Sequence, residues 1–421
     1  MLKQSPSKAI LASRLRQSLG VALGMSFAAA ASWAQTVTPA PPTAGTEEPR
    51  DPYYIGVGLG FTHESNVLRQ AVAESDNLVS TTLLGGLNTT LGRQRFYLDG
   101  TISDNRYQNI SALNNTSYGL TTGLDLSTSG RLSGSLRYGV TESLANQATP
   151  GLVSTGQSNT EKSQLAGARL RLEVTSRVAM EAGLQHRSLD YSEPTFVSRE
   201  NTQNVANAGL VYGVTGYLTF GVGVRATKID TPYYSPAGGD KTDRKDMDFT
   251  STWSPSSLST LTGRLSVGKE DHSRATASNF SGLTGLVSWD YRPTGRLNFS
   301  TSFSRDTGTE TRFIGFVGGT EPLATEAYRL TNTAQANVHY LVTGKIDANV
   351  SVSRTTGPLV SGNVASGSDT LGTYGIGVTY RATRSINLSC QLGHESRSTT
   401  STFSTAYSAN TAGCMARLTL R

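Results

Sequence analysis

The chain has 421 residues, of which 36% are hydrophobic and 16% are charged, and its formal net charge is +6. The 17 Tyr and 12 Phe, together with this low charge, exclude a disordered chain. Ser and Thr make up about a quarter of the sequence, and Gly adds 44 residues. Small and β-forming residues throughout the chain favour many short strands over a large soluble α/β enzyme.

Residues 1–34 have the three parts of a secretory signal peptide. Four basic residues come first without an acidic one, an apolar stretch covers 19–31, and Ser32-Trp33-Ala34 forms a small-x-small site with the predicted cut after Ala34. The apolar stretch is too short to favour the alternative, a membrane anchor. Its removal leaves 33 basic residues (37 minus 4) against 31 acidic ones, a net charge of +2. Nucleic acid is therefore not an expected partner.

Residues 35–52 contain five Pro and no strand pattern, which predicts a flexible periplasmic leader. Beyond them no apolar run reaches 18 residues, so no transmembrane helix is expected. An exported chain of this kind can cross a membrane only as a closed β-barrel, because only helices and barrels satisfy their backbone groups in lipid.

Residues 53–421 repeat one pattern, in which apolar and polar residues alternate with period two. In 218–225, for example, large apolar residues alternate with Thr219, Gly221, Gly223 and Arg225. One apolar and one polar face indicate strands that meet water on one side only. In chain order the expected strands are 53–63, 78–91, 94–107, 115–128, 131–144, 161–175, 177–191, 203–213, 216–229, 243–254, 257–271, 277–292, 295–306, 326–342, 344–355, 369–382, 384–396 and 405–421.

The connections between these strands alternate in length. Short turns such as 92–93 and 293–294 alternate with longer polar loops, which include 145–160, 230–242, 307–325 and 356–368. This layout is typical of a bacterial outer-membrane barrel with its short turns in the periplasm. We therefore expect residues 53–421 to form an all-β, antiparallel transmembrane β-barrel of about 18 strands, with 16 as the alternative, and both barrel ends on the periplasmic side.

Aromatic residues near the short turns support this interpretation. Tyr212, Trp253, Tyr291, Tyr340 and Tyr380 each precede a short turn and lie on the apolar face. Such residues form the interfacial girdle of membrane barrels, here the periplasmic one. A soluble β-sandwich would need larger side chains than the many Gly, Ala and Ser on the apolar face, and no blade-length repeat supports a propeller.

The segment after the first expected strand carries a resemblance to a known family. Glu64-Ser65-Asn66, separated by two residues from Arg69, resembles the acidic-Ser-Asn-x-x-Arg signature of outer-membrane barrels encoded in exopolysaccharide biosynthesis operons, the EpsL type, which are related to β-barrel porins. The motif has seven residues from His63. The resemblance implies a role in exopolysaccharide export, with polysaccharide and periplasmic export components as partners.

Charged residues on the polar face are candidates for lining the lumen. A barrel of this size encloses an aqueous interior, so a polar lining is expected whatever passes through it. Hydroxyls, amides and charges of both signs suit a hydrated sugar or polyol and predict no strong ion selectivity. The alternative is that the charges only pair across strands. The candidates are Arg169, Arg171, Glu173, Glu181, Arg187, Arg225, Arg244, Asp246 and Arg264.

The loop 307–325 is unusually apolar around Phe313 and Phe316. It is a candidate constriction that folds into the lumen. The alternatives are a contact with a neighbouring subunit and a simple extension of the flanking strand.

The two cysteines, Cys390 and Cys414, lie on the apolar face of the last two expected strands, equally spaced from residue 402. In a symmetric hairpin they are directly opposed at a separation that permits a disulfide, and the periplasm allows one to form. Two separate lipid-facing thiols are the alternative.

The sequence offers little support for an enzyme. His63, His272 and His394 fall near the extracellular end with Ser residues close by, but no nucleophile–base–orienter set is visible. Neither a metal site nor a phosphate loop is expected, and no cofactor.

The sequence thus predicts an outer-membrane β-barrel in contact with lipid and lipopolysaccharide. Its expected role is a channel or scaffold in exopolysaccharide export. The alternative is a general or sugar-type diffusion porin, and a lipid-acting barrel enzyme is a remote one.

Overall fold

The computed structural model describes residues 52–128, 130–146, 156–235, 238–274, 279–307, 330–361, 364–401 and 404–420. The expected signal peptide at 1–34, residues 35–51 of the expected leader (35–52), and the apolar loop residues Phe313 and Phe316 lie outside the described residues.

Eighteen strands and two short 3₁₀ helices make up the described chain. Residues 111–113 form η1 between β3 and β4, and residues 194–199 form η2 between β7 and β8. The strands are β1 Tyr53–Glu64, β2 Asp76–Leu91, β3 Gln94–Tyr107, β4 Asn115–Ser127, β5 Leu132–Leu144, β6 Thr160–Glu173, β7 Val178–Tyr191, β8 Asn201–Thr215, β9 Leu218–Ser235, β10 Gly238–Ser256, β11 Ser259–His272, β12 Phe280–Thr294, β13 Leu297–Asp306, β14 Thr331–Leu341, β15 Ile346–Ser361, β16 Val364–Arg381, β17 Ile386–Thr399 and β18 Tyr407–Leu420.

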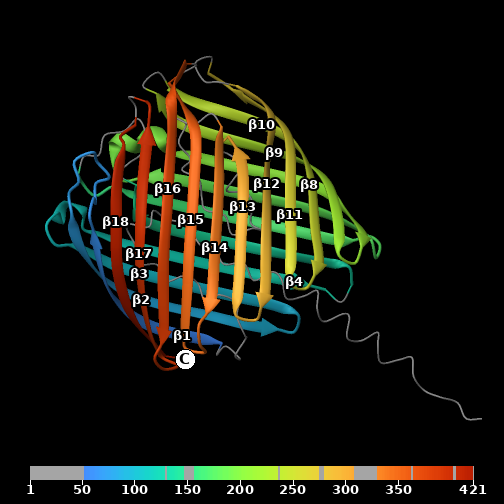
Figure 1. Ribbon diagram of the computed structural model, residues 1–421. Helices are drawn as coiled ribbons and strands as arrows, with labels where there is room; N and C mark the ends of the chain where they lie inside the picture. The colour runs from blue at the N-terminus through green and yellow to red at the C-terminus, as the bar shows by residue number, and fades with distance from the viewer. Residues whose placement is uncertain are drawn as a thin grey trace, which may run out of the picture.

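The strands close into one antiparallel barrel. Each strand pairs with its neighbours in sequence, and β1 pairs with both β2 and β18, so the sheet has no free edge (Figure 1). At the closing seam Ile55 is opposite Leu420 and Glu64 is opposite Thr411. The expectation of an all-β barrel of about 18 strands is confirmed, and the alternative of 16 is wrong.

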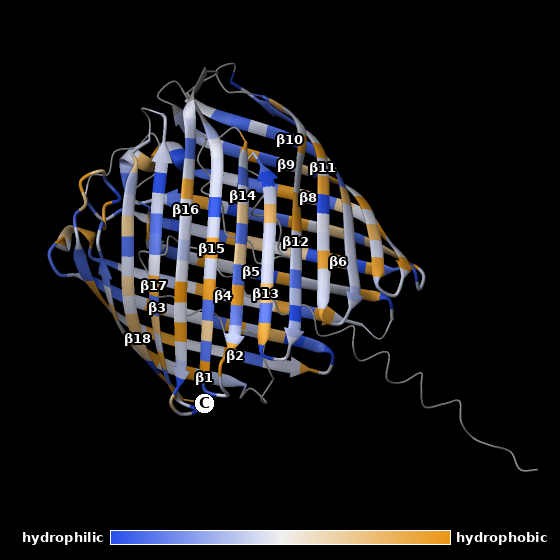
Figure 2. Cartoon of the chain, in the orientation of Figure 1, coloured by the Kyte–Doolittle hydropathy of each residue, from blue (hydrophilic) through white to orange (hydrophobic). Residues whose placement is uncertain are grey.

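The barrel wall has two chemically different faces. In β1 the residues Ile55, Val57, Leu59 and Phe61 are exposed on the outside, while the alternate residues, including Gly56, are buried on the inside. The hydropathy colouring shows the same alternation along the other strands (Figure 2). The period of two read from the sequence therefore sets which side chains face outward.

The strand connections differ in length between the two ends of the barrel. The eight turns that follow even-numbered strands from β2 to β16 are short, and the first places Gly92 at a φ of 64°, which glycine adopts without strain. The start of β1 and the end of β18 also lie at this rim, where Ile55 is opposite Leu420. Longer connections, such as the 11-residue segment between Glu64 and Asp76, lie at the opposite end. The short-turn rim is therefore the periplasmic one.

The prediction of a long loop is wrong for two segments. Residues 230–235 and 238–242 belong to the ladder between β9 and β10, where Lys241 pairs with Asp230. Residues 356–361 and 364–368 likewise belong to β15 and β16, where Gly357 pairs with Asp369. In both segments the regular alternation of apolar and polar residues breaks down, because a strand that extends beyond the membrane need not present an apolar face to lipid.

The largest buried apolar cluster of the described chain caps the extracellular end rather than filling the barrel. It joins Val67 and Leu68 of the β1–β2 connection with Leu113 of η1 and the ends of three strands at Leu78, Tyr107 and Leu144. This cluster fixes the β1–β2 connection against the inside of the wall.

Candidate functional site: the barrel interior

An accessible cluster of charges lies on the inner face of β6 and β7. The guanidinium groups of Arg169 and Arg171 contact the two carboxylate oxygens of Glu181, at 2.7 Å and 2.5 Å. All three side chains keep contact with solvent, and that of Arg171 is 38% exposed. Because two cations share one carboxylate, the cluster presents hydrogen-bond donors to the interior of the barrel.

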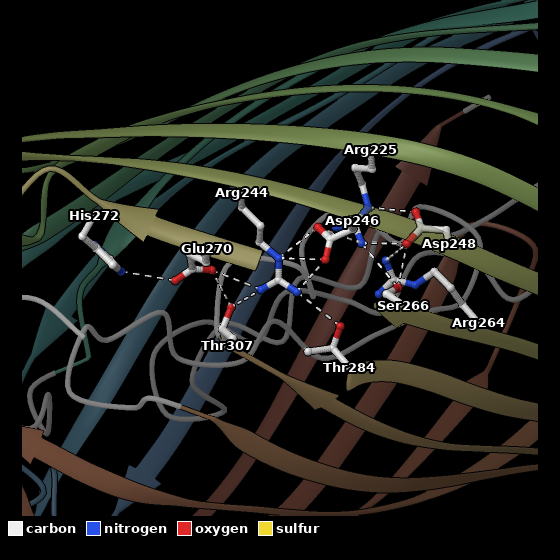
Figure 3. A network of polar contacts seen from close by, with 10 residues as sticks. All are labelled: Arg225, Arg244, Asp246, Asp248, Arg264, Ser266, Glu270, His272, Thr284 and Thr307. Atoms are coloured by element: carbon white, nitrogen blue, oxygen red, sulfur yellow. Dashed lines mark hydrogen bonds and ion pairs between the residues drawn. The ribbon is translucent and has the colours of Figure 1, made fainter. Parts of the chain in front are cut away.

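A second set of charges, on β9, β10 and β11, is buried in the wall (Figure 3). The Arg244 side chain is 0% exposed and donates to Asp246 at 2.9 Å and to Glu270 at 3.1 Å. Its remaining donors reach the hydroxyls of Thr284, at 3.2 Å, and Thr307. Such a closed set of charge-assisted hydrogen bonds compensates the cost of burying the guanidinium.

The same network continues toward the periplasmic end. Arg225 makes two hydrogen bonds of 3.0 Å to Asp248 and lies 3.4 Å from Asp246. Ser266 donates to Asp248 at 2.7 Å, and Arg264 lies 4.0 Å from it. Arg225, Arg264 and Asp248 therefore stiffen the wall across three strands.

Gly268 is a residue of this network that the sequence did not reveal. A Cβ atom at this position would collide with the Asp246 carboxylate, so glycine leaves the space that Asp246 occupies between Arg225 and Arg244. The signal in the sequence was weak, since Gly268 is one of 44 glycines and sits in an ordinary alternation.

The two other lumen candidates share the inner face with these clusters. Arg187, on β7, is 3% exposed, whereas Glu173 is exposed at the periplasmic end of β6. The nine candidates thus separate by burial. Arg169, Arg171, Glu173 and Glu181 are accessible, while Arg187, Arg225, Arg244 and Asp246 are buried and Arg264 is nearly so.

His272 extends the buried network toward the extracellular end. Its Nε2 lies 3.4 Å from Glu270 and its Nδ1 lies 2.6 Å from Asp240. On the outer face at this level the strands carry Lys269 and Asp271 in place of apolar residues, so His272 is beyond the membrane-spanning part of β11. The hydrogen bonds to Glu270 and Asp240 raise the pKa of the imidazole to about 9.

The motif that begins at His63 forms a latch at the barrel seam. Arg69 is buried, with a φ of 54°, and pairs with Glu64 of β1 at 2.8 Å and with Glu395 of β17 at 3.2 Å. Glu395 also accepts a hydrogen bond of 2.5 Å from Tyr407 of β18. These contacts tie the first strand to the last two, which explains how so unusual a backbone conformation is held.

The middle residues of the motif complete the latch. Asn66 donates to the carbonyl oxygens of Gln70, at 2.7 Å, and Ser408, at 3.2 Å. The Ser65 hydroxyl accepts from the backbone N–H of Asn410 at 2.8 Å. The acidic residue, Ser, Asn and Arg of the motif therefore each have a structural role at the seam, through contacts made within the chain.

The cysteines are joined on the outer face of the last hairpin. Cys390 of β17 is directly opposite Cys414 of β18, with a Cα–Cα distance of 4.1 Å and a disulfide between them. The bridge cross-links the strands next to the closing seam, below the latch.

The five aromatic residues that precede short turns all lie on the outer face. Tyr212, Trp253, Tyr340 and Tyr380 are each more than 40% exposed, and Tyr291 stacks on Trp289 with a centroid distance of 5.3 Å. They form a band just above the periplasmic rim, where amphipathic rings are favoured.

The histidines do not come together as a catalytic set. His63 and His394 lie on the outer face and contact Asn77 and Asn410 at 2.9 Å and 2.7 Å, whereas His272 is on the inner face of β11. The Nε2 atom of His272, which a nucleophile would need, faces Glu270 instead. Across the described ranges, no group of three potential ligands could hold a metal ion.

No helix among the described residues is long and apolar enough to cross a membrane.

The outside of the barrel fits a lipid environment. Large apolar side chains such as Leu59, Phe220, Leu265 and Ile376 are exposed around it, and the closed sheet leaves no unpaired edge in the wall. An exposed apolar belt of this extent is stable only in contact with lipid. The chain is an outer-membrane β-barrel, with the contact to membrane lipid that this location entails.

Comparisons with known proteins found no match to any family model and none to a curated protein. Among solved structures, the chain is similar to the Pseudomonas aeruginosa protein OccK1 (OpdK), with 12% identity, a TM-score of 0.48, and coverage of 87% of this chain and 99% of that one. OpdO from the same organism has 11% identity, a TM-score of 0.47 and coverage of 87% and 96%. A BenF-like porin from Pseudomonas fluorescens Pf-5 has 13% identity, a TM-score of 0.44 and coverage of 87% and 99%. None of the comparisons supports the resemblance to the exopolysaccharide-operon barrels.

Proposed function

We propose that this barrel is a passive diffusion channel for small, hydrated polar solutes. The observation that carries the proposal is the accessible cluster of Arg169, Arg171 and Glu181 on the inner face of a closed 18-stranded wall. Barrels with this number of strands are wide enough to hold water, and exposed guanidinium and carboxylate groups are stable only where water reaches them.

The mixed charge of the cluster sets the expected solute class. Two guanidinium groups and one carboxylate exchange hydrogen bonds with hydroxyl and carbonyl groups without demanding a particular net charge. The charges of the second set, such as Arg244 and Asp246, satisfy one another and are withdrawn from solvent. We therefore expect passage of neutral sugars and small ions with weak ion selectivity.

A swelling assay with liposomes that contain the purified barrel tests this function. Isotonic solutions of neutral sugars of increasing size should swell the liposomes at rates that fall with solute size. Liposomes prepared without the protein are the control. Absence of swelling with the smallest sugar would contradict the proposal.

The competing interpretation is export of exopolysaccharide, which the motif resemblance implies. The contacts of Arg69 and Asn66 account for the motif by closure of the seam. Loss of secreted polymer after gene deletion, from cells whose purified barrel gives no swelling, would favour export over diffusion.

A further inference from the structure

A small hollow lies on the inner face of β6, at Gly167. This glycine is opposite Arg137 of β5 and Gln185 of β7, so it separates two long polar side chains. Apart from its chain neighbours, a Cβ atom at Gly167 would meet a single heavy atom within 4 Å, a backbone oxygen of β7 at 3.7 Å. In the same row of the wall, the space above Gly123 is filled by the ring of Tyr97. Gly167 therefore leaves room on the inner face where its neighbour in the row does not.

The side chains beside this hollow carry hydrogen-bond donors without an acceptor. Within the described part of the chain, Nε of Arg137 and Nε2 of Gln185 are withdrawn from solvent and have no partner. The same holds for Nε and Nη2 of Arg187, which follows Gln185 on the inner face of β7 and is 3% exposed. Adjacent strands are about 4.8 Å apart, so the side chains of Arg137 and Gln185 start roughly 10 Å from each other, on either side of Gly167. Burying donors without partners is costly. The hollow therefore calls for an acceptor from outside the chain.

The acidic residues on this part of the inner wall are engaged elsewhere. Glu181 is shared by the two arginines of the accessible cluster. Glu161 of β6 accepts a hydrogen bond of 2.9 Å from the hydroxyl of Tyr191. Asp125 of β4 is on the far side of β5 from the hollow, and it does not bond to Nε of Arg137. None of these carboxylates therefore supplies the acceptor that the donors at Gly167 lack.

We propose that the hollow at Gly167 binds the carboxylate of a sugar acid, a small solute that carries one carboxylate and several hydroxyls. Nε and Nη2 form one edge of the Arg187 guanidinium, and such an edge matches the two oxygens of a carboxylate. Arg137 adds a second positive charge, and the amide of Gln185 suits a hydroxyl. The inference rests on the diffusion function proposed above, because only a solute that enters the lumen reaches the inner wall.

Charge separates this solute from a neutral sugar of the same size. Arg137 and Arg187 both lie beside the hollow, and a neutral sugar would leave their positive charges uncompensated. A solute that passes through a channel must also leave each site on its way. We therefore expect weak binding, with a Kd of about 1 mM, and a preference for the acid that adds to passage of neutral sugars rather than replacing it.

Saturation-transfer NMR titration of the full-length folded barrel in detergent tests the site, with galacturonate as the probe and galactose as its neutral counterpart. The wild type should bind galacturonate about tenfold more tightly than galactose, and Arg137→Gln should remove about this factor. Arg417→Gln is the matched control. Arg417 also has an Nη2 without a partner on the inner face, but the space at Gly58, opposite it, is crowded by Thr82 and Met415. Equal affinity of the wild type and Arg137→Gln for galacturonate would overturn the proposal.

A second variant tests the hollow itself and leaves the charges in place. Gly167→Val fills the space, so binding of galacturonate should be lost while the heat-modifiable mobility of a folded barrel is kept. Wild-type binding in this variant, or tighter binding of galactose 6-phosphate than of galacturonate, would contradict the assignment.

The swelling assay separates this inference from the function on which it rests. Swelling with neutral sugars but no binding of galacturonate would overturn the site alone. Binding of galacturonate without swelling would support the site and contradict the diffusion function.

Discussion

Two clusters of arginine and carboxylate groups on the same inner wall differ in their exposure to solvent. On β6 and β7, Arg169 and Arg171 share the single carboxylate of Glu181 and remain accessible. On β9 to β11, Arg244 is enclosed by two carboxylates, two threonine hydroxyls and the ring of Phe280 at 5.6 Å. An inward direction alone therefore does not make a residue part of the channel surface.

This difference separates stability from function in the wall. A buried charge that loses its partner is costly, whereas an exposed pair contributes about 0–1 kcal/mol. Substitutions in the Arg244 network should therefore act on folding, and substitutions around Glu181 should act on conduction. The following predictions are ordered from the largest expected effect to the smallest.

Replacing Arg244 with Leu should give the largest effect, because the buried carboxylates would lose their central cation: Asp246 would keep only Arg225, at 3.4 Å, and Glu270 only His272, at 3.4 Å. We expect a loss of roughly 3–5 kcal/mol in the free energy of unfolding. Urea titration of the barrel in lipid vesicles measures it. The matched substitution Arg171→Leu should cost about 1 kcal/mol or less. Equal losses in the two variants would remove the distinction between the clusters.

The stability of the barrel should depend on pH through His272, which lies at the extracellular end of the buried network. Its pKa is raised to about 9 in the folded barrel, so protonated His272 stabilises the fold fully below its unfolded value of about 6.5. This contribution should disappear as the pH rises through about 9. The stability difference between the wild type and His272→Gln should therefore shrink between pH 6 and pH 10 in urea titrations. A difference that stays constant or grows would contradict the ion-pair geometry.

Glu181→Gln should have the smallest effect on stability but a clear effect on ion conduction. The substitution leaves Arg169 and Arg171 as accessible cations, so the reversal potential in a KCl gradient should shift toward anion selectivity. Unfolding free energy should change by about 1 kcal/mol or less. Asp246→Asn, whose carboxylate is fully buried in the Arg244 network, is the comparison. An equal shift of its reversal potential would mean that both clusters face the ion path.

The sequence predicts the membrane part of this barrel well and the rest poorly. Alternation in segments such as 218–225 places Arg225 on the inner face because a strand in lipid must sort its side chains. Above the membrane this constraint ends, so the sequence pattern indicates a loop where the β9–β10 hairpin in fact continues around Lys241. Burial depended on contacts between strands that are far apart in sequence, as in the 63-residue separation of Arg244 and Thr307.

The contacts of Arg69 at the barrel seam also depend on residues that are far apart in sequence. The residues from Glu64 to Arg69 stood out as a motif, but their partner Glu395 is 326 residues away from Arg69. A local motif could not indicate that its arginine closes the barrel. The opposed positions of Cys390 and Cys414 could be anticipated because both belong to one hairpin, whose symmetry fixes the register.

The accessibility of single introduced cysteines during current recording tests the central claim most directly. Arg171→Cys and Ser266→Cys are placed in a Cys390→Ser/Cys414→Ser background, and a charged, water-soluble methanethiosulfonate reagent is added to single channels in a planar bilayer. Because Arg171 is accessible and Ser266 is fully buried, conductance should fall stepwise for the first variant and stay constant for the second. Unchanged conductance in the Arg171→Cys channel would contradict a solute path along this cluster.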